Sequence, residues 1–261
     1  MLLFELADGR AHLHTGDMRW QPAMANHPAL AAAVRERRLH TVYLDTTYCS
    51  PQYAFPPQPA AIGALVQKAR EYAESRNTLL LFGAYSIGKE RAFLAVSETL
   101  GERLHVPRAR LRVYEAALSG MCDVAKKFTT DEKATRLRVV PMGHINFAKL
   151  RALVGGSSRW QSVVGFRPTG WAHTKVGGGG AKGASSPAEE RTPAKPRPAA
   201  PLHVRRQGRV TIVDVAYSEH SSFSELRACV RALEPVRCVP TVNGNSAAKV
   251  AEMLQHLSAE H

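Results

Sequence analysis

Residues 78–104 read TLLLFGAYSIGKERAFLAVSETLGERL, an apolar run that leads through a short polar loop into an amphipathic stretch. The run over residues 78–85 predicts a buried strand, because a strand covered on both faces needs no polar alternation. Residues 89–104 carry apolar side chains at three- and four-residue spacing, which predicts a helix. Together they favour an α/β architecture with a covered sheet.

The same alternation of strand and helix continues along the chain. Short β-branched runs predict further strands at residues 41–46, 137–141, 162–167, 209–217 and 237–242. Helical spacing predicts helices at residues 59–76, 107–118, 147–154 and 221–233. In such sheets the chemistry lies in loops beyond the carboxyl ends of the strands. The sequence therefore predicts an α/β fold with its functional residues in those loops.

Composition narrows the class of protein. The 261 residues include 35 Lys and Arg against 22 Asp and Glu, a net charge of +13, and this surplus favours a polyanion partner such as nucleic acid. A hydrophobic content of 44% excludes global disorder. No apolar run approaches the roughly 18 residues that span a bilayer, so no membrane partner is expected. The four cysteines form no C-x-x-C pair, which excludes a zinc ribbon and fits a reducing compartment.

One segment has almost no residues that could fill a core. Residues 176–201 read VGGGGAKGASSPAEERTPAKPRPAAP. Glycine-, serine- and proline-rich sequence of this kind stays flexible, because burial cannot offset the entropy of the chain. We expect a disordered insertion in a loop, within a domain and not at its boundary.

Three polar clusters could carry chemistry, and each has a plainer alternative. His12 and His14 would share one face of a strand with Asp17 beyond its end, either as metal ligands or as structural histidines. Ser86, Gly88 and Lys89 lie between a strand and a helix, where backbone N–H groups and a lysine favour phosphate. The alternative is that Ser86 is simply the N-cap of the helix.

The third cluster is residues 218–222, which read SEHSS between a predicted strand and helix. Ser221 or Ser222 is a natural N-cap, and this would leave His220 projecting at the turn. A histidine at this place acts as a general acid or a zinc ligand, or is an ordinary surface residue.

Taken in order, six strings resemble one family. They are HTGD (14–17), YLDTTYCSP (43–51), GAYSIGKE (83–90), FRPTGW (166–171), YSEHSSFSEL (217–226) and PTVN (240–243). This order resembles the DNA-repair branch of the metallo-β-lactamase/β-CASP nucleases, whose members include Artemis and Apollo, and is most similar to the cross-link-repair exonuclease type. The similarity covers nearly the whole chain apart from residues 176–201.

The resemblance implies a fold and a division into domains. It implies an α/β metallo-β-lactamase domain, an αββα sandwich, that is interrupted by a β-CASP α/β domain. On this plan residues 1–48 form the incomplete first part of the metallo-β-lactamase domain. Residues 49–157 form the β-CASP domain, and residues 158–261 resume the first domain with the insertion at 176–201.

The resemblance also implies roles for single residues. Asp17 matches a zinc-ligand aspartate, Asp45 an acidic residue that orients active-site groups, and His220 a histidine that protonates the leaving oxygen. Ser86, Gly88 and Lys89, together with Ser218, match residues that bind DNA phosphates. Val242 stands where RNA-processing relatives carry a zinc-binding histidine, which favours the DNA branch.

One family motif is missing. The H-x-H-x-D-H string that supplies further zinc ligands occurs nowhere in the 261 residues, and one carboxylate does not hold zinc usefully in water. The expectation is an N-terminally truncated sequence, with a shortened paralogue as the alternative.

The function implied is a nuclear, zinc-dependent 5′-to-3′ DNA exonuclease of interstrand cross-link and double-strand-break repair, acting on DNA with a 5′-phosphate. The alternatives are a non-catalytic protein that binds damaged DNA as a scaffold and an RNA-processing nuclease. The sequence identifies no protein partner.

Overall fold

A computed structural model describes residues 1–120, 122–170 and 201–258 of the chain. The described residues form two compact units. Unit 1 holds residues 1–55 and 218–258, and unit 2 holds residues 56–170 and 201–217. Within the described residues, no helix is both long and apolar enough to cross a membrane.

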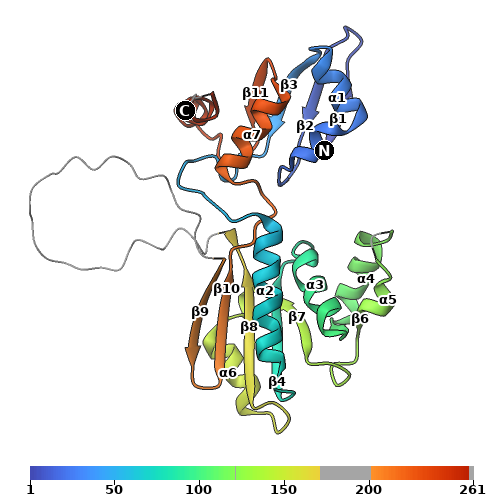
Figure 1. Ribbon diagram of the computed structural model, residues 1–261, viewed down its shortest axis with the longest axis vertical. Coiled ribbons are helices and arrows are strands. Elements are labelled where there is room, and N and C mark those ends of the chain that lie inside the picture. The colour runs from blue at the N-terminus through green and yellow to red at the C-terminus, as the bar shows by residue number, and fades with distance from the viewer. Residues whose placement is uncertain (121, 171–200, 259–261) are drawn as a thin grey trace, which may run out of the picture. The chain divides into compact units, whose positions relative to one another are not determined.

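Unit 2 is built on a seven-stranded sheet (Figure 1). Its strands, in spatial order, are β6 (Phe128–Thr129), β5 (Leu104–His105), β7 (Leu137–Pro141), β4 (Thr78–Ala84), β8 (Ser162–Pro168), β10 (Val210–Val215) and β9 (Leu202–Gln207). All neighbours pair in parallel except the edge strand β9, which runs antiparallel to β10. Strand β4 is buried throughout, as its apolar sequence predicts.

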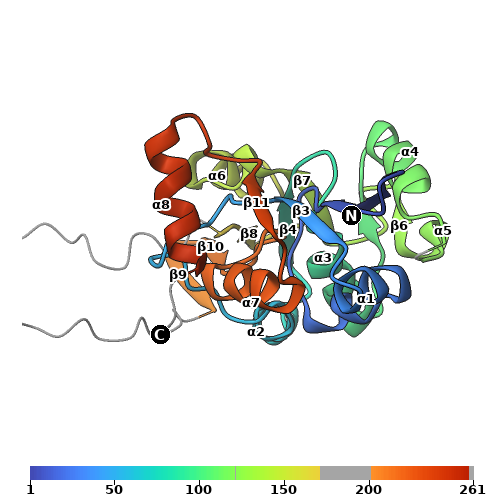
Figure 2. The same ribbon diagram turned by 90° about the horizontal axis from the view of Figure 1, so that it is seen from above.

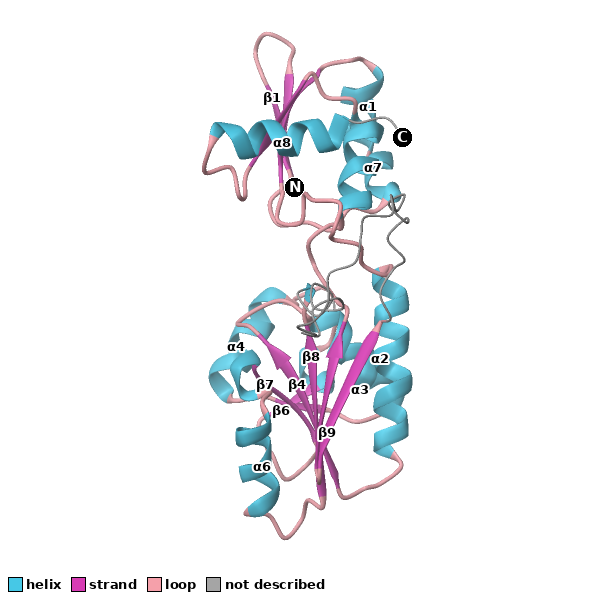
Figure 3. Ribbon diagram, turned by 90° about the vertical axis from the view of Figure 1, so that its left-hand side faces the viewer, coloured by secondary structure: helices cyan, strands magenta, loops and turns pink. Residues whose placement is uncertain are grey.

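Helices cover both faces of this sheet. One face packs with α2 (Gln58–Ala73), α3 (Glu90–Leu100) and α4 (Arg108–Ala117) in a single apolar cluster. The opposite face packs with α6 (Phe147–Gly155) through Leu150 and Val154. Figure 3 shows α2 and α6 on opposite sides of the strands. Two short elements, α5 (Val124–Lys127) and the 3₁₀ helix η2 (Met142–His144), complete the unit.

Unit 1 has a smaller sheet of four strands in the order β1 (Leu2–Glu5), β2 (Ala11–His14), β3 (Leu39–Leu44) and β11 (Arg237–Pro240). Its core joins the sheet to α1 (Pro28–Arg35), α7 (Phe223–Leu233) and α8 (Ala247–Ser258). Helix α8 flanks the β11 edge (Figure 2). A 3₁₀ helix, η1 (Pro22–Asn26), precedes α1. Strand β2 alternates as predicted, with Leu13 in the core and His14 exposed.

The expected α/β class is confirmed, and the predicted strands appear within a few residues of their expected limits. Two helices end three or four residues earlier than predicted. Helix α3 ends at Leu100, because Gly101 adopts φ +65° and stops it, so Leu104 starts strand β5 instead. Helix α2 ends at Ala73. Strands β1, β5, β6 and β9 and helices α5 and α8 were not predicted.

The two units do not follow the expected boundaries. Strands β8, β9 and β10 lie after residue 158, yet β8 pairs with β4 and completes the seven-stranded sheet of unit 2. Among the described residues, the chain returns to unit 1 at Ser218. Which unit corresponds to which family domain stays a prediction. Of the expected insertion at 176–201, residues 176–200 lie outside the described residues.

Candidate active site

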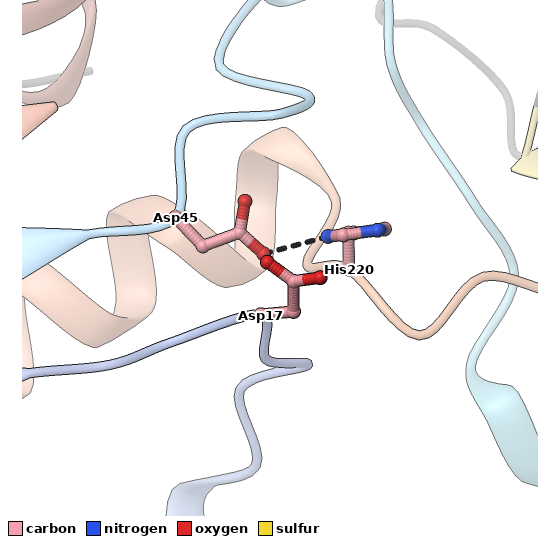
Figure 4. Close-up of side chains that lie close together, drawn as sticks. All are labelled: Asp17, Asp45 and His220. Carbon is pink, nitrogen blue, oxygen red and sulfur yellow. Dashed lines mark hydrogen bonds and ion pairs between the residues drawn. The ribbon is translucent and has the colours of Figure 1, made fainter. Parts of the chain in front are cut away.

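Three side chains from distant parts of the sequence meet in unit 1. Asp17 follows β2, Asp45 follows β3, and His220 precedes α7. One ligand atom from each lies within 4.8 Å of the other two, and Figure 4 shows the carboxylate of Asp17 beside the pair formed by Asp45 and His220. The structure thus brings together three of the residues singled out in the sequence.

Strand topology explains this meeting. Strands β2 and β3 are parallel neighbours, so the residues that follow them emerge at the same edge of the sheet. The turn before α7 is fastened there by Ser221, whose backbone N–H and hydroxyl both donate to the carbonyl oxygen of Met18 at 2.9 and 3.0 Å. Its hydroxyl also accepts from the N–H of Trp20.

Asp45 is buried, and both of its carboxylate oxygens are fully hydrogen-bonded. Oδ1 accepts from the N–H and hydroxyl of Thr47 at 3.1 and 2.6 Å. Oδ2 accepts from the N–H of Met18 at 3.1 Å and pairs with Nδ1 of His220 at 2.7 Å. A carboxylate offers about four acceptor positions. All four are used within the protein, so Asp45 suits the orienting role better than that of a metal ligand.

These bonds decide the ionisation of Asp45. Burial raises the pKa of its carboxyl, but the bonds from His220, Thr47 and Met18 together lower the pKa by more, so that it lies below the usual 3.8. The carboxylate is therefore negative at neutral pH. A negative partner at Nδ1 fixes the tautomer in which Nδ1 carries a proton.

His220 is held by its backbone as well as by its ring. The Ser218 hydroxyl accepts from the N–H of His220 at 3.0 Å and donates to its carbonyl oxygen at 2.9 Å. The buried ring of Tyr48 meets the imidazole edge-on, with the ring centroids 6.1 Å apart. Ser218, which the sequence associates with phosphate, thus positions the turn that carries His220.

An ion pair between a buried arginine and a half-buried glutamate supports the same turn. The guanidinium of Arg19 bonds the carboxylate of Glu225 at 3.0 Å, and the Arg19 side chain is only 5% exposed. Arg19 also donates to the carbonyl oxygen of Ser218 at 3.2 Å. Glu225 and Ser222 form a capping box at the start of α7, which confirms Ser222 as the N-cap.

Several of these groups had no role assigned to them from the sequence. They are Thr15, which accepts from the N–H of Asp45, together with Met18, Arg19, Thr47, Tyr48 and Glu225. The S-x-x-E spacing of the capping box was readable, because it is a sequence signature of a helix start. The N–H of Met18 has no such signal.

The loop proposed for phosphate lies in unit 2. Helix α3 begins at Glu90, and Lys89 stands at its N-cap with φ +74°, so the alternative of Ser86 as N-cap is wrong. Ser86 is exposed. The N–H of Gly88 donates to the carboxylate of Glu90 at 2.6 Å, and the buried Lys89 ammonium lies 5.2 Å from the ring centroid of Tyr217. An acidic group thus already occupies an N–H that a phosphate would use.

Comparison with known proteins decides the family. Residues 122–246 match the family described as DNA repair metallo-beta-lactamase. The chain belongs to this family. The DNA-repair metallo-β-lactamase match covers β8, β9, β10 and α7, including His220.

Three relatives are similar along nearly the whole chain. DNA cross-link repair protein SNM1 of Arabidopsis thaliana is 36% identical over 250 residues, which are 95% of this chain and 46% of that protein. DNA cross-link repair 1A protein of Gallus gallus is 37% identical over 93% of this chain and 23% of that protein. The 5′ exonuclease Apollo of Gallus gallus is 30% identical over 100% of this chain and 46% of that protein. The chain therefore spans less than half the length of these relatives.

The DNA-repair metallo-β-lactamase family implies metal, and the cluster fits it in part. Carboxylates and imidazoles are ordinary zinc ligands, but a catalytic zinc takes about three of them from the protein. Asp17 is exposed, and no hydrogen bond or ion pair joins its carboxylate to another described residue. With Asp45 already saturated, Asp17 and His220 fall short of three. The described residues supply only part of a metal site.

Proposed function

We propose that this protein is a nuclease of DNA cross-link repair that hydrolyses DNA phosphodiesters from a 5′ end with the help of zinc. The family and its relatives support a repair nuclease. The surplus of 13 positive charges suits a DNA substrate.

The observation that carries this proposal is the 2.7 Å pairing of Asp45 with His220 beside the exposed Asp17. With a proton fixed on Nδ1 by Asp45, the opposite nitrogen, Nε2, serves as the site of proton transfer to the leaving oxygen. A positioned acid of this kind contributes roughly 10²–10⁴-fold to a rate. Asp45 acts through His220 and is a positioning residue.

Zinc, when bound, lowers the pKa of a bound water and stabilises charge on phosphoryl oxygens. In this proposal Asp17 is one of its ligands. The donors free to bind it among the described residues number fewer than the three that a catalytic zinc takes from a protein.

Recognition of a 5′-phosphate is assigned in this proposal to Ser86, Gly88 and Lys89. The hydroxyl of Ser86 is exposed, Gly88 offers an N–H, and Lys89 brings a positive charge close to the same loop. A terminal phosphate would displace the Glu90 carboxylate from the N–H of Gly88. Selection of the terminal phosphate would set the 5′-to-3′ direction.

A second function has one observation in its favour. The incomplete donor set suits a protein that binds DNA and does not cleave it. Such a protein would bind with the salt sensitivity expected of phosphate contacts.

The test is digestion of 3′-labelled single-stranded DNA with and without a 5′-phosphate, in zinc and in chelator. The proposal predicts shortening from the 5′ end, faster with the 5′-phosphate and absent in chelator. Salt-sensitive DNA binding without cleavage would establish the second function instead, provided that the zinc content of the protein sample has been measured. As DNA repair requires, we place the protein in the nucleus, which imaging of a fluorescent fusion would check.

A further inference from the structure

Four ionisable side chains converge on the α6 face of unit 2, away from the loop assigned to the 5′-phosphate. The centre is Asp214 of β10, whose side chain is 7% exposed. Its Oδ1 accepts from Nε of Arg167 at 2.5 Å, and its Oδ2 accepts from a terminal nitrogen of Arg205 at 3.0 Å. Nδ1 of His203 lies 3.7 Å from the same Oδ2.

Sheet register places these residues together. Asp214 pairs with Arg167 on the parallel strand β8 and with His203 on the antiparallel strand β9. Arg205 lies two residues along β9, opposite Ile212. Paired residues and residues two apart share one face of a sheet, and Ile212 belongs to the cluster packed on α6. All four residues therefore lie on the face that α6 covers.

The cluster carries an excess of positive charge. Two guanidinium groups face one carboxylate, which leaves one positive charge before any contribution from His203. The arginines are also accessible, because the side chains of Arg167 and Arg205 are 37% and 38% exposed.

The N–H donors of the two guanidinium groups are also not all used. A guanidinium has five N–H donors, and Asp214 takes one from each arginine. The Arg205 guanidinium is steadied by Phe147, whose ring centroid lies 5.7 Å away. Asp214 thus presents two oriented guanidinium groups that together retain a positive charge and unused donors.

We propose that Arg167 and Arg205, oriented by Asp214, bind an internal phosphodiester of the DNA backbone. This inference rests on the proposed function, since it names a second contact for the same substrate. Oriented arginine donors match phosphate geometry.

The position separates this contact from the terminal phosphate. The Ser86–Lys89 loop follows β4 and leads into α3, which covers the face of the sheet opposite to Arg167 and Arg205. Arg167 lies on β8, next to β4, and Arg205 lies on β9, three strand intervals from β4. At about 4.8 Å per interval β9 lies roughly 14 Å from β4, so the proposal assigns Arg205 and this loop to different phosphates. Arg205 therefore contacts the backbone downstream of the 5′ end, and its contribution does not depend on a 5′-phosphate.

A plainer explanation is that β9 is an edge strand, and charges on an edge discourage pairing with another chain. That explanation treats Arg205 and its neighbour Arg206 alike. Arg206 pairs with Thr211, on the opposite face from Asp214, and its guanidinium donates to the carbonyl oxygen of Gly208. It is a matched control with the same charge on the same strand.

The experiment compares wild type, Arg205→Gln and Arg206→Gln in binding 3′-labelled oligothymidylate in chelator, over a range of salt. We expect Arg205→Gln to bind roughly five- to tenfold more weakly and to reduce the slope of log K against log salt by about one, equally with and without a 5′-phosphate. Arg206→Gln should change the DNA affinity and the salt slope much less. Equal effects of the two variants, or an Arg205 effect confined to 5′-phosphorylated DNA, would overturn the proposal.

A second variant guards against loss of folding. Arg205→Lys keeps the charge beside Asp214 but not the planar fork, and should bind with an affinity between those of wild type and Arg205→Gln. A different outcome is that Arg205→Lys binds DNA with wild-type affinity while Arg205→Gln and Arg206→Gln bind it equally weakly. A general effect of charge would then explain the binding, and the proposal would fail. Wild type that binds no DNA would instead contradict the proposed function itself.

Discussion

Nδ1 of His220 lies 2.7 Å from Oδ2 of Asp45, although the two residues are 175 positions apart in the sequence. Because Asp45 accepts three further hydrogen bonds from Met18 and Thr47, its carboxylate cannot turn away without breaking them. The imidazole is therefore held in one orientation and one tautomer, as acid catalysis requires.

Asp17 should matter for metal and not for folding. Asp17→Asn removes an exposed carboxylate, so the free energy of unfolding should change by less than about 0.5 kcal/mol. Zinc affinity, measured by titration calorimetry, should fall. Asp8→Asn is the control, since Asp8 is also exposed but pairs with Arg10. Equal zinc affinity in the two variants would remove Asp17 from the metal site.

Acid should weaken unit 1 through Asp45. The folded pKa of Asp45 is lowered below 3.8, so its carboxylate adds stability above that value and loses the contribution as pH falls through the folded pKa. In urea unfolding, wild type should exceed Asp45→Asn in stability near neutral pH, and the gap should narrow below pH 3.8. A gap that widens in acid would contradict this assignment.

The Arg19–Glu225 pair should be costly to break from one side. Glu225→Gln keeps the hydrogen bonds of the capping box but removes the negative charge beside the buried Arg19, and should cost about 3 kcal/mol. Ser222→Ala removes the N-cap and keeps the ion pair, and should cost only about 1 kcal/mol. Denaturant unfolding of both variants would test this order, and a larger loss in Ser222→Ala would refute it.

Close packing in unit 2 leaves little room for a side chain at Gly165. A Cβ on Gly165 of β8 would lie 2.8 Å from Ile145 and 2.9 Å from Leu150, so Gly165→Ala should destabilise by about 1–3 kcal/mol. Gly63 of α2 has nothing within 4 Å of such a Cβ, and Gly63→Ala should be neutral or stabilising by up to about 1 kcal/mol. Thermal unfolding would compare the two variants. Equal changes in Tm would show that the packing around Gly165 is looser than the 2.8 and 2.9 Å contacts indicate.

Local sequence predicted the elements but not their partners. Strand Leu137–Pro141 appears at its predicted limits, because a short apolar run bounded by polar residues is a local signal. Strand β9 was missed, because its exposed LHVRRQ sequence shows no clear alternation. The assignment of β8 to unit 2 could not be predicted, since it depends on pairing with β4, some 80 residues earlier.

The candidate site was likewise predicted only in part from the sequence. Asp17, Asp45 and His220 were identified through ordered motifs and lie together. Ser86 was considered as an N-cap, but Lys89 in the left-handed region moves the helix start to Glu90. The saturation of Asp45 could not be predicted, because two of its four donors are backbone N–H groups, which any residue type supplies.

The most direct test is the single-turnover rate of hydrolysis of 5′-phosphorylated single-stranded DNA by Asp45→Asn, His220→Gln and the double variant. If Asp45 acts through His220, each single change should slow hydrolysis by about 100-fold or more, and the double variant should be little slower than either. Wild-type rates in both single variants, or losses that multiply in the double variant, would contradict the account.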